Sequence, residues 1–563
     1  MSQNFYLFFF IYFFIIFAVT GIGLAASNIL KINNNYAEIN DNFGYTGLIG
    51  IFLLIIYSYL SHFFFKHNFT HNILILSIGF LYFIYSFVKM ESKKKFLPFI
   101  LVFIFLFLGF LILKNHDDFS YYHFHYSYYL TQFSALIGIG QFNHGFRTQS
   151  SIFYLNSIFY LPVIKYYMFN ISAVLLMGFS NLILLSKIFK NINSNNVNFN
   201  TYLSLLSFIF INIFFYRIGE HGTDRSAQIL IFLLIIIIFD FFKSNQSINN
   251  FFPIFILMGI IISLKAFYIL YLILFFPILL SFNNKKLIFY FISLVKNIYF
   301  ILFCLIIFSV LITNFINSGC LIYPVHFSCV GTFDWSIPID EVVKMNIHYE
   351  QWSKAGKGPN FSLENPEFYI KNLNWVSHWI DEYFFNKVSD YLLGLLFLLF
   401  VVFGTFFTKK KIKQSNTDKN IYVLYLFLIL LFVEWFYNHP ALRYGGYCLI
   451  ALILFVPFSI ILSKIKTNNK IIKLKFLILL IVVSIIFSGR NINRISNEIE
   501  KYSYFPLDDP FYKINDTYLI FDKEFTSLIS NYKNCQNLKE NCNLKLKPKL
   551  RRYRNTFIFV NNK

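Results

Sequence analysis

Charged residues are scarce in this 563-residue chain: Asp, Glu, Lys and Arg together make up 13% of it, whereas hydrophobic residues make up 57%. A soluble protein of this size could not cover so much apolar surface with so few charges, so the soluble classes are excluded. The sequence has instead recurring stretches of about 20 apolar residues, the length needed to cross roughly 30 Å of hydrocarbon. This pattern predicts a polytopic membrane protein of the all-α class.

The first apolar stretch, 5–25, lacks the basic n-region and the small-residue cleavage site of a signal peptide, so we expect a retained span. About fourteen candidate spans lie near 5–25, 45–64, 71–89, 96–114, 170–187, 201–216, 227–243, 252–264, 266–282, 297–315, 388–408, 420–437, 443–463 and 473–489. We interpret 251–282 as two short spans interrupted at Ser263-Leu264-Lys265. The expected bundle therefore has about 12–14 transmembrane helices.

Most of the lysines behind the net charge of +21 lie in short loops between these spans. The lysine-rich loops are 89–95, 187–190, 283–286, 409–414 and 464–475. This positive-inside distribution favours membrane lipids, rather than nucleic acid, as partners of the excess charge. Alternation then places the N-terminus and the remaining connections on the other, non-cytoplasmic side: 115–169, 217–227, the break at Lys265, 316–387, 438–443 and the tail 490–563.

The same assignment divides the chain into five parts. They are N-terminal transmembrane helices (1–90), a transmembrane core with the first large loop 115–169 (91–315), a second long loop (316–387), C-terminal transmembrane helices (388–489) and a tail (490–563). We expect the tail to form a small, partly ordered periplasmic segment.

Cysteines are few, and none has the Cys-x-x-Cys spacing of a zinc site. Cys304 and Cys448 fall within predicted spans, where we expect inert core residues. The other four form two short-range pairs on the predicted outer side: Cys320 with Cys329, and Cys535 with Cys542. Such pairs suit disulfides in an oxidising compartment such as a periplasm, with free thiols as the alternative.

The segment HDDFSYYHFHY (116–126) directly follows the predicted span 96–114 and contains the adjacent carboxylates Asp117 and Asp118. A carboxylate beside the bilayer can act as a general base on a hydroxyl, or bind a hard divalent cation such as Mg²⁺ or Mn²⁺. For the surrounding tyrosines and histidines, an interfacial aromatic belt is the favoured explanation. Because basic residues are the usual anchors at an anionic interface, the carboxylates favour a functional role.

Four more charged residues lie on the same predicted side. Lys265 interrupts an apolar run, and an unpaired ammonium there must face a cavity or an anion. Arg443 begins a span, where a guanidinium can bind a phosphate bidentately. Glu220 and Asp224 precede another apolar run, with a helix N-cap as the alternative role of Asp224. Together these residues suit a site that takes an anionic lipid-borne donor and activates an acceptor hydroxyl.

The architecture resembles that of GT-C-type glycosyltransferases, polytopic enzymes that use polyprenyl-phosphate sugars and carry an acidic residue in the first large outer loop. More narrowly, patches between about 100 and 555 resemble a family of bacterial membrane proteins related to that fold. The matching residues of the first loop are Asp118, Tyr122-His123, GIGQFNHGFR (138–147, ending in Arg147) and Ser150-Ser151. Further matches are Gly319, Tyr323-Pro324, Asp334-Trp335, Pro338, Pro440, Arg443, Tyr444, Gly445, Cys535 and Cys542.

The resemblance implies inverting transfer of a sugar from a polyprenyl-phosphate-linked donor to a glycan or lipid acceptor of the cell envelope. The site would face the periplasm in a bacterial inner membrane, with outer juxtamembrane helices beside it. The spacing to Tyr122-His123 favours Asp118 as the catalytic base, with Asp117 as the other candidate, and either acid could hold a divalent cation. The residues expected to contact substrate are Tyr122, His123, Arg147, Glu220, Asp224, Lys265, Asp334 and Arg443.

Two other functions stay open. An O-antigen ligase or polymerase also uses a lipid-linked donor, and the long loop 316–387 suits it, although the acidic motif in an early loop suits the GT-C interpretation better. A transporter or flippase typically has polar residues near the bilayer midplane and internal repeats. The sequence shows no repeat, and its polar residues concentrate on one face. Convergence of Asp118, Lys265 and Arg443 in one outer cavity would favour transfer, whereas a two-sided path would favour transport.

Overall fold

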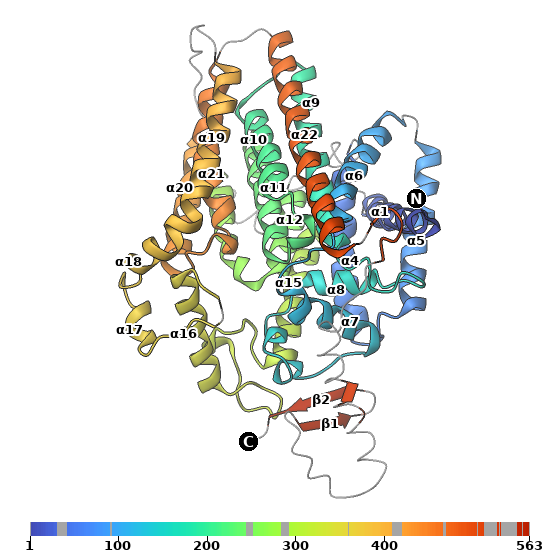
Figure 1. Ribbon diagram of the computed structural model, residues 1–563, viewed down its shortest axis with the longest axis vertical. Coiled ribbons are helices and arrows are strands. Elements are labelled where there is room, and N and C mark those ends of the chain that lie inside the picture. Colours follow the sequence, from blue (N-terminus) through green and yellow to red (C-terminus); the bar gives the residue numbers. More distant parts are fainter. Residues whose placement is uncertain are drawn as a thin grey trace, which may run out of the picture.

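The computed structural model describes residues 2–30, 42–90, 93–243, 251–282, 292–358, 360–407, 419–465, 469–503, 505–511, 549–553 and 556–561, together with positions 526, 527 and 530. Over these residues the chain is helical apart from its connecting loops and one C-terminal hairpin (Figure 1). Ten of the described helices are long and apolar enough to cross a membrane. The protein is therefore a multi-pass membrane protein built mainly from α-helices, as predicted.

The first half of the chain contains four long N-terminal helices and a loop of short ones. The N-terminal elements are α1 (Gln3–Ile29), α4 (Phe43–His62), α5 (Phe69–Lys89), η1 (Lys93–Lys95) and α6 (Phe96–Phe110). The loop elements are η2 (Phe119–His123), α7 (Phe124–Gln132), η3 (Ile139–Gln141), η4 (His144–Arg147) and α8 (Ser151–Ile158). The helices that follow are α9 (Ile171–Asn193), α10 (Phe199–Phe214), η5 (Ile218–Glu220), α11 (Asp224–Lys243) and α12 (Phe252–Leu264).

The second half repeats this alternation of membrane helices and loop. It begins with η7 (Ala266–Leu274), α13 (Phe275–Leu280) and α15 (Ile298–Ser318). The second long loop holds η9 (His326–Ser328), α16 (Ile339–Ala355), α17 (Pro366–Ile370), α18 (Val376–Trp379) and η10 (Ile380–Val388). The remaining elements are α19 (Ser389–Phe406), α20 (Lys419–Asn438), η11 (Leu442–Tyr444), α21 (Gly446–Ser463), α22 (Asn469–Tyr502), β1 (Lys549–Tyr553) and β2 (Thr556–Val560).

Every apolar run predicted as a span coincides with a helical segment, although some segments are short. Phe199–Phe214, Phe252–Leu264 and Ala266–Leu280 are apolar but have fewer residues than a full span. The predicted break within 251–282 is present, because α12 ends at Leu264 and η7 begins at Ala266. Lys265 between them is extended, with φ −157° and ψ 122°. The break therefore directs the Lys265 side chain away from the helix line.

Three details differ from the sequence-based expectation. The helix α22 continues from Asn469 to Tyr502, well beyond the predicted end at 489, because its polar second half packs against the loops below. Cys304 is exposed, not part of the core, since α15 lies at the edge of the bundle and buries only 39% of its apolar window. The tail adds an antiparallel hairpin to the otherwise helical fold.

That hairpin packs on the first large loop. In β2 the side chains alternate, so Phe557 and Phe559 turn inwards and are only 6% and 0% exposed. The N–H of Ile137 donates to the carbonyl of Phe557 (3.0 Å), and the N–H of Phe559 donates to the carbonyl of Ile137 (2.8 Å). The C-terminal strand thus fixes the backbone immediately before the Gly-rich segment 138–147.

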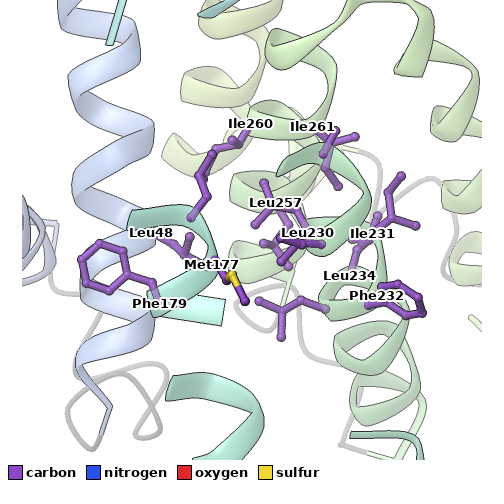
Figure 2. Packing of buried hydrophobic residues seen from close by; sticks show 14 of the residues in the cluster. Leu48, Met177, Phe179, Leu230, Ile231, Phe232, Leu234, Leu257, Ile260 and Ile261 are labelled. Carbon is purple, nitrogen blue, oxygen red and sulfur yellow. The ribbon is translucent and has the colours of Figure 1, made fainter. Parts of the chain in front are cut away.

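The core of the bundle lies where α4, α9, α11 and α12 meet. Leu48, Met177, Leu230 and Leu257 from these helices point towards one another (Figure 2). The apolar windows of α9 and α11 are each 89% buried, whereas those of α5 and α20 are 22% and 28% buried. The peripheral helices therefore present an apolar surface that a lipid bilayer would cover.

The two ends of the bundle differ chemically (Figure 1). The lysine-rich ends of α9 and α22 lie together at the top of the view, where Lys473 Nζ donates to Asn193 Oδ1 at 3.2 Å. The short loop helices α7, α8, α16 and α17 lie in the lower half of the view, with the hairpin below them. The N-terminus lies at the right of the view, above mid-height, and the N–H of Ser2 donates to the carbonyl of Leu507 just beyond α22 (3.1 Å).

Glycines let α1 approach α4 and α5 closely. A Cβ at Gly23 would overlap the carbonyl oxygen of Thr46 on α4, and one at Gly21 would overlap that of Gly79 on α5. Small residues at such crossings are typical of membrane helix packing, where close van der Waals contact drives association. On the exposed face of α19, by contrast, a Cβ at Gly404 would meet no atom within 4 Å.

We expect Gly23→Ala to destabilise the protein by about 1–3 kcal/mol, because α1 and α4 must separate to admit one methyl group. Gly404→Ala adds the same methyl group in open space and should be neutral or slightly stabilising, since Ala favours the helix by about 1 kcal/mol. Thermal unfolding of the two purified variants in detergent measures the difference. Equal melting temperatures would contradict the tight packing of α1 on α4.

Candidate functional site

Asp118 lies at the start of the π-helical turn η2, shortly after the chain leaves α6. Its carbonyl accepts hydrogen bonds from the N–H groups of Tyr122 (3.0 Å) and His123 (3.3 Å). The second bond spans five residues, so this turn is wider than an α-helical one. It brings His123 back over Asp118, and π-helical turns of this kind are frequent at functional sites.

His116 is the second histidine next to Asp118. Its Nδ1 accepts the N–H of Asp118 at 3.1 Å and is 3.7 Å from Asp118 Oδ2. The rings of His116 and His123 stack with centroids 5.3 Å apart. Burial lowers the pKa of both histidines, so both are neutral near pH 7 and keep a nitrogen lone pair. We call His116, Asp118 and His123 the His-Asp-His cluster.

The two adjacent carboxylates have different surroundings. The Asp118 side chain is 38% exposed, its Oδ2 is 3.7 Å from His116 Nδ1, and it lies within 4.8 Å of a ligand atom of each histidine. Asp117 is exposed, and among the described residues its carboxylate makes no hydrogen bond or ion pair. The structure therefore places Asp118 in the His-Asp-His cluster and leaves Asp117 at the surface beside it.

Lys265 and Asp224 bring a second pair of charges to the cluster from the membrane core. Lys265 Nζ lies 2.5 Å from Asp224 Oδ1, with the side chains 30% and 12% exposed. The ammonium also lies 4.5 Å from the ring centroid of Tyr444, a cation–π contact. Asp224 is the first residue of α11 and Lys265 is the break between α12 and η7, so the pair joins two helix ends.

Arg443 completes this arrangement from the turn before α21. Its Nη2 donates to the hydroxyl of Tyr444 at 2.6 Å. Gln228 of α11 holds the turn by donating to the Arg443 carbonyl (2.9 Å) and accepting from the N–H of Cys448 (3.1 Å). The Arg443 side chain remains exposed, so part of its guanidinium faces away from the protein.

Electrostatic interactions show that these groups share one region. The pKa of His116 is lowered first by burial, while Asp118 and Asp224 act to raise it and Arg225 and Arg443 to lower it further. Lys265 acts in the same way on His123. We call Arg225, Lys265 and Arg443 the cationic rim. The rim carries three positive charges, and the two carboxylates, Asp118 and Asp224, carry two negative charges. The net charge of these five groups is therefore +1, which favours an anionic ligand.

Tyr122, which is expected from the sequence to contact substrate, lies next to His123. Its ring packs edge-on against His123 at 4.4 Å, and Gly145 leaves the space that it occupies. Burial raises its pKa, and the charges of Asp118 and Asp224 raise it further. The hydroxyl therefore stays protonated and can donate a hydrogen bond.

Arg147 lies at the edge of the site and joins two loops. Its Nε donates to the carbonyl of Gly140 (2.9 Å), and its Nη1 contacts Glu341 Oε1 (2.7 Å) and the hydroxyl of Tyr323 (3.1 Å). The side chain is only 9% exposed, and its donors are largely used within the protein. Arg147 thus fastens the Gly-rich segment to the second long loop.

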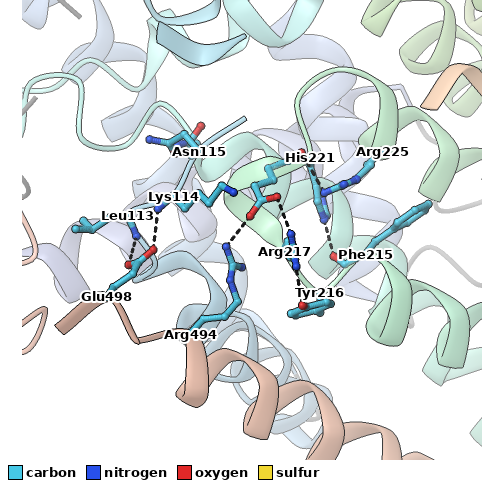
Figure 3. Close-up of polar contacts among 12 residues, drawn as sticks. Leu113, Lys114, Asn115, Phe215, Tyr216, Arg217, His221, Arg225, Arg494 and Glu498 are labelled. Atoms are coloured by element: carbon cyan, nitrogen blue, oxygen red, sulfur yellow. Dashed lines mark hydrogen bonds and ion pairs between the residues drawn. The ribbon is translucent and has the colours of Figure 1, made fainter. Parts of the chain in front are cut away.

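Glu220, expected to contact substrate, is used in holding the site together. It forms ion pairs with Arg494 of α22 (2.7 Å) and Arg217 (3.4 Å). Glu498, one turn beyond Arg494, accepts the N–H groups of Leu113 (2.8 Å) and Lys114 (3.0 Å). Figure 3 shows Arg494 and Glu498 reaching from α22 to the segment before His116 and to the turn before α11.

Asp334 lies apart from the His-Asp-His cluster in its contacts. It is 61% exposed, pairs with Arg551 of β1 at 2.6 Å, and accepts the N–H of Asn561 on its carbonyl at 2.8 Å. It therefore fastens the hairpin to the second long loop. Nearby, Cys320 and Cys329 form the predicted disulfide, whereas Cys535 and Cys542 lie outside the described residues.

Several residues of the site were not predicted from the sequence. The interfacial belt is the favoured explanation of His116 from the sequence, and only the structure brings His116 to Asp118 and His123. Arg225 and Tyr444 were not singled out as site residues. Arg494 and Glu498 follow Arg490 at intervals of four, a spacing that puts charges on one helix face and signals a helix longer than the predicted span.

We expect Lys265→Met to lower stability by about 1–3 kcal/mol, because it leaves the largely buried Asp224 carboxylate without its partner. The double variant Lys265→Met/Asp224→Asn should recover most of this loss, since no unpaired charge remains. Lys357→Met is the matched control, because its pair with Glu382 is also 2.5 Å long but 41% and 44% exposed. Thermal unfolding in detergent measures all three, and an equal effect of Lys265→Met and Lys357→Met would contradict the assignment.

Comparison with known proteins gives one match. No curated protein and no solved structure matches the chain. A family model described as a domain of unknown function, DUF8201, matches residues 5–450. The matched region includes the His-Asp-His cluster and the cationic rim and covers well over half of the chain, so the protein belongs to the DUF8201 family.

Proposed function

We propose that the protein is a GT-C-type integral membrane glycosyltransferase that uses a polyprenyl-phosphate-linked sugar donor. One observation carries this proposal: Asp118 lies beside the Lys265–Asp224 pair and Arg443 at a single end of the apolar bundle. These residues come from four separate segments, so their meeting is a property of the fold and not of one local motif. Their combination supplies a carboxylate for an acceptor and cations for a phosphate.

The charges suit the two halves of a glycosyl transfer. Asp118 orients the acceptor hydroxyl, or takes its proton, for attack on the anomeric carbon from the face opposite the phosphate. The bond from that carbon to the phosphate oxygen breaks, and the configuration inverts. Arg443 and Lys265 stabilise the negative charge that develops on the leaving phosphate. The neutral hydroxyl of Tyr122 is available to bind the sugar.

A lipid-borne donor also suits the surface next to Lys265. The segment that starts there exposes large apolar side chains, Leu270 (40%), Phe276 (58%) and Leu280 (66%). A prenyl chain lying on this surface would have its phosphate beside the cationic rim. The acceptor is proposed to be a glycan or lipid of the cell envelope.

The proposed location is the inner membrane of a bacterium, with the site on the periplasmic face. The support is the opposition between the lysine-rich ends of the bundle and the end that carries the site (Figure 1). The disulfide between Cys320 and Cys329, on the same side as the site, suits an oxidising compartment.

The two carboxylates provide a matched test. In a strain that lacks the gene, we expect one lipid-linked sugar intermediate to accumulate and one surface glycan to be lost, which identifies donor and acceptor. Returning the Asp118→Asn variant should leave transfer about 10²–10⁴-fold below wild type, because the base or its orienting charge is missing. Asp117→Asn, which removes an exposed carboxylate one residue away, should retain activity.

The assay measures transfer of the identified sugar in isolated membranes, with immunoblots showing equal amounts of each variant. Wild-type transfer by Asp118→Asn would refute the proposed role of Asp118. Growth of glycan chains by whole repeat units would indicate a polymerase or ligase instead. Loss of the surface glycan with a fully assembled lipid-linked intermediate trapped on the cytoplasmic side would indicate a flippase.

A further inference from the structure

The His-Asp-His cluster has the composition and geometry of a metal site. His116, Asp118 and His123 each offer one ligand atom, and these atoms all lie within 4.8 Å of one another. In a tetrahedral site with metal–ligand bonds of about 2.1 Å, neighbouring ligand atoms are about 3.4 Å apart. Closing to that distance requires only modest side-chain movement. His116 and Asp118, at 24% and 38% exposure, have room to make it.

A second and independent observation concerns His123. The residue is only 5% exposed, and its Nε2 is shielded from solvent without a hydrogen-bond partner among the described residues. Buried polar atoms in proteins nearly always have a partner, so this imidazole nitrogen is available to bind a ligand. The imidazole is also held firmly, because it packs between the rings of His116 and Phe153 at 5.3 Å and 4.9 Å.

The fold also fixes the other two ligands. The π-helical turn joins His123 to Asp118, and the N–H of His116 donates to the carbonyl of Gly219 at 3.1 Å. The N–H of Asp118 donates to His116 Nδ1, and a metal bound through that nitrogen would replace this one hydrogen bond. The cluster is therefore positioned by main-chain contacts that do not depend on a metal.

We propose that His116, Asp118 and His123 bind a divalent transition metal, Mn²⁺ or Zn²⁺. Two imidazoles and one carboxylate suit these borderline metals, whereas Mg²⁺ and Ca²⁺ prefer oxygen ligands. Three protein ligands leave coordination positions open, as in catalytic metal sites. This ligand set differs from the pair Asp117 and Asp118 that the sequence suggested as metal ligands, because it leaves out Asp117 and includes two histidines.

The cationic rim adds a condition to metal binding. Without metal, the rim and the two carboxylates together have a net charge of +1. A bound divalent cation raises this net charge to +3. Such a net charge disfavours the metal unless an anion binds with it, so metal and phosphate should strengthen each other's binding. Metal binding itself can be measured without any sugar donor, so the test does not depend on the proposed transfer.

The experiment uses the full-length protein, purified in detergent and stripped with a chelator. It is equilibrated with Mn²⁺, Zn²⁺ or Mg²⁺ separately, with and without inorganic phosphate at a concentration that leaves the metal soluble. Bound metal per chain is measured by mass spectrometry after desalting. We expect about one Mn²⁺ or Zn²⁺ per wild-type chain, tighter binding with phosphate, and at least tenfold weaker binding in His116→Ala and Asp118→Asn.

Asp117→Asn is the matched control and should bind as wild type does. His116→Ala alters a partly exposed residue, and its melting temperature without metal shows whether it is folded. Failure of wild type to bind Mn²⁺ and Zn²⁺ would overturn the proposal. Equal binding by wild type and folded His116→Ala would do the same, and tighter binding of Mg²⁺ than of either transition metal would overturn the assignment of the imidazole ligands.

Discussion

The ion pair between Lys265 and Asp224 is the contact on which the site depends. An ammonium placed within an apolar bundle is costly unless an anion meets it, and Asp224 meets it at 2.5 Å. To make this contact, the chain must end α12 at Leu264 and start α11 at Asp224, so two helix ends are fixed together. The Tyr444 ring over the ammonium adds the turn that carries Arg443. One charge pair therefore sets the positions of three segments.

The charged residues near the site are of two kinds. Some are paired within the protein and join its segments, and others keep exposed surface that a ligand can contact. Arg147, Glu220 and Asp334 are each paired with a partner from a distant segment: Glu341, Arg494 and Arg551. Arg443 and Asp118 keep exposed surface and form no such ion pair with a distant segment. The division follows from the low dielectric at the end of the bundle, where a charge with no partner is expensive. Groups that stay available are thus few, and they lie together.

The sequence allowed the helices to be predicted, because apolar run length alone decides whether a segment can span a bilayer. The break at Lys265 was also predicted, since it depends on local residues. The roles of Glu220 and Asp334 were not, because their partners Arg494 and Arg551 lie far along the chain. The pairing of His116 with His123 depends on a π-helical turn, which has no sequence signature of its own. Local sequence patterns therefore predict the helices. Ion pairs between distant segments determine which charged side chains remain open to a ligand, and these pairs cannot be predicted from local patterns.

The hairpin β1–β2 has a consequence for how the protein is made. Its strand β2 supplies both hydrogen bonds that hold Ile137, at the start of the Gly-rich segment, and it is synthesised after all of the membrane helices. Protein chains emerge from the N-terminus and fold progressively during synthesis. The first large loop therefore lacks the two backbone hydrogen bonds at Ile137 until β2 has been synthesised. A chain released from the ribosome before β2 is made would hold the described helices of the bundle and lack the strand that fixes Ile137.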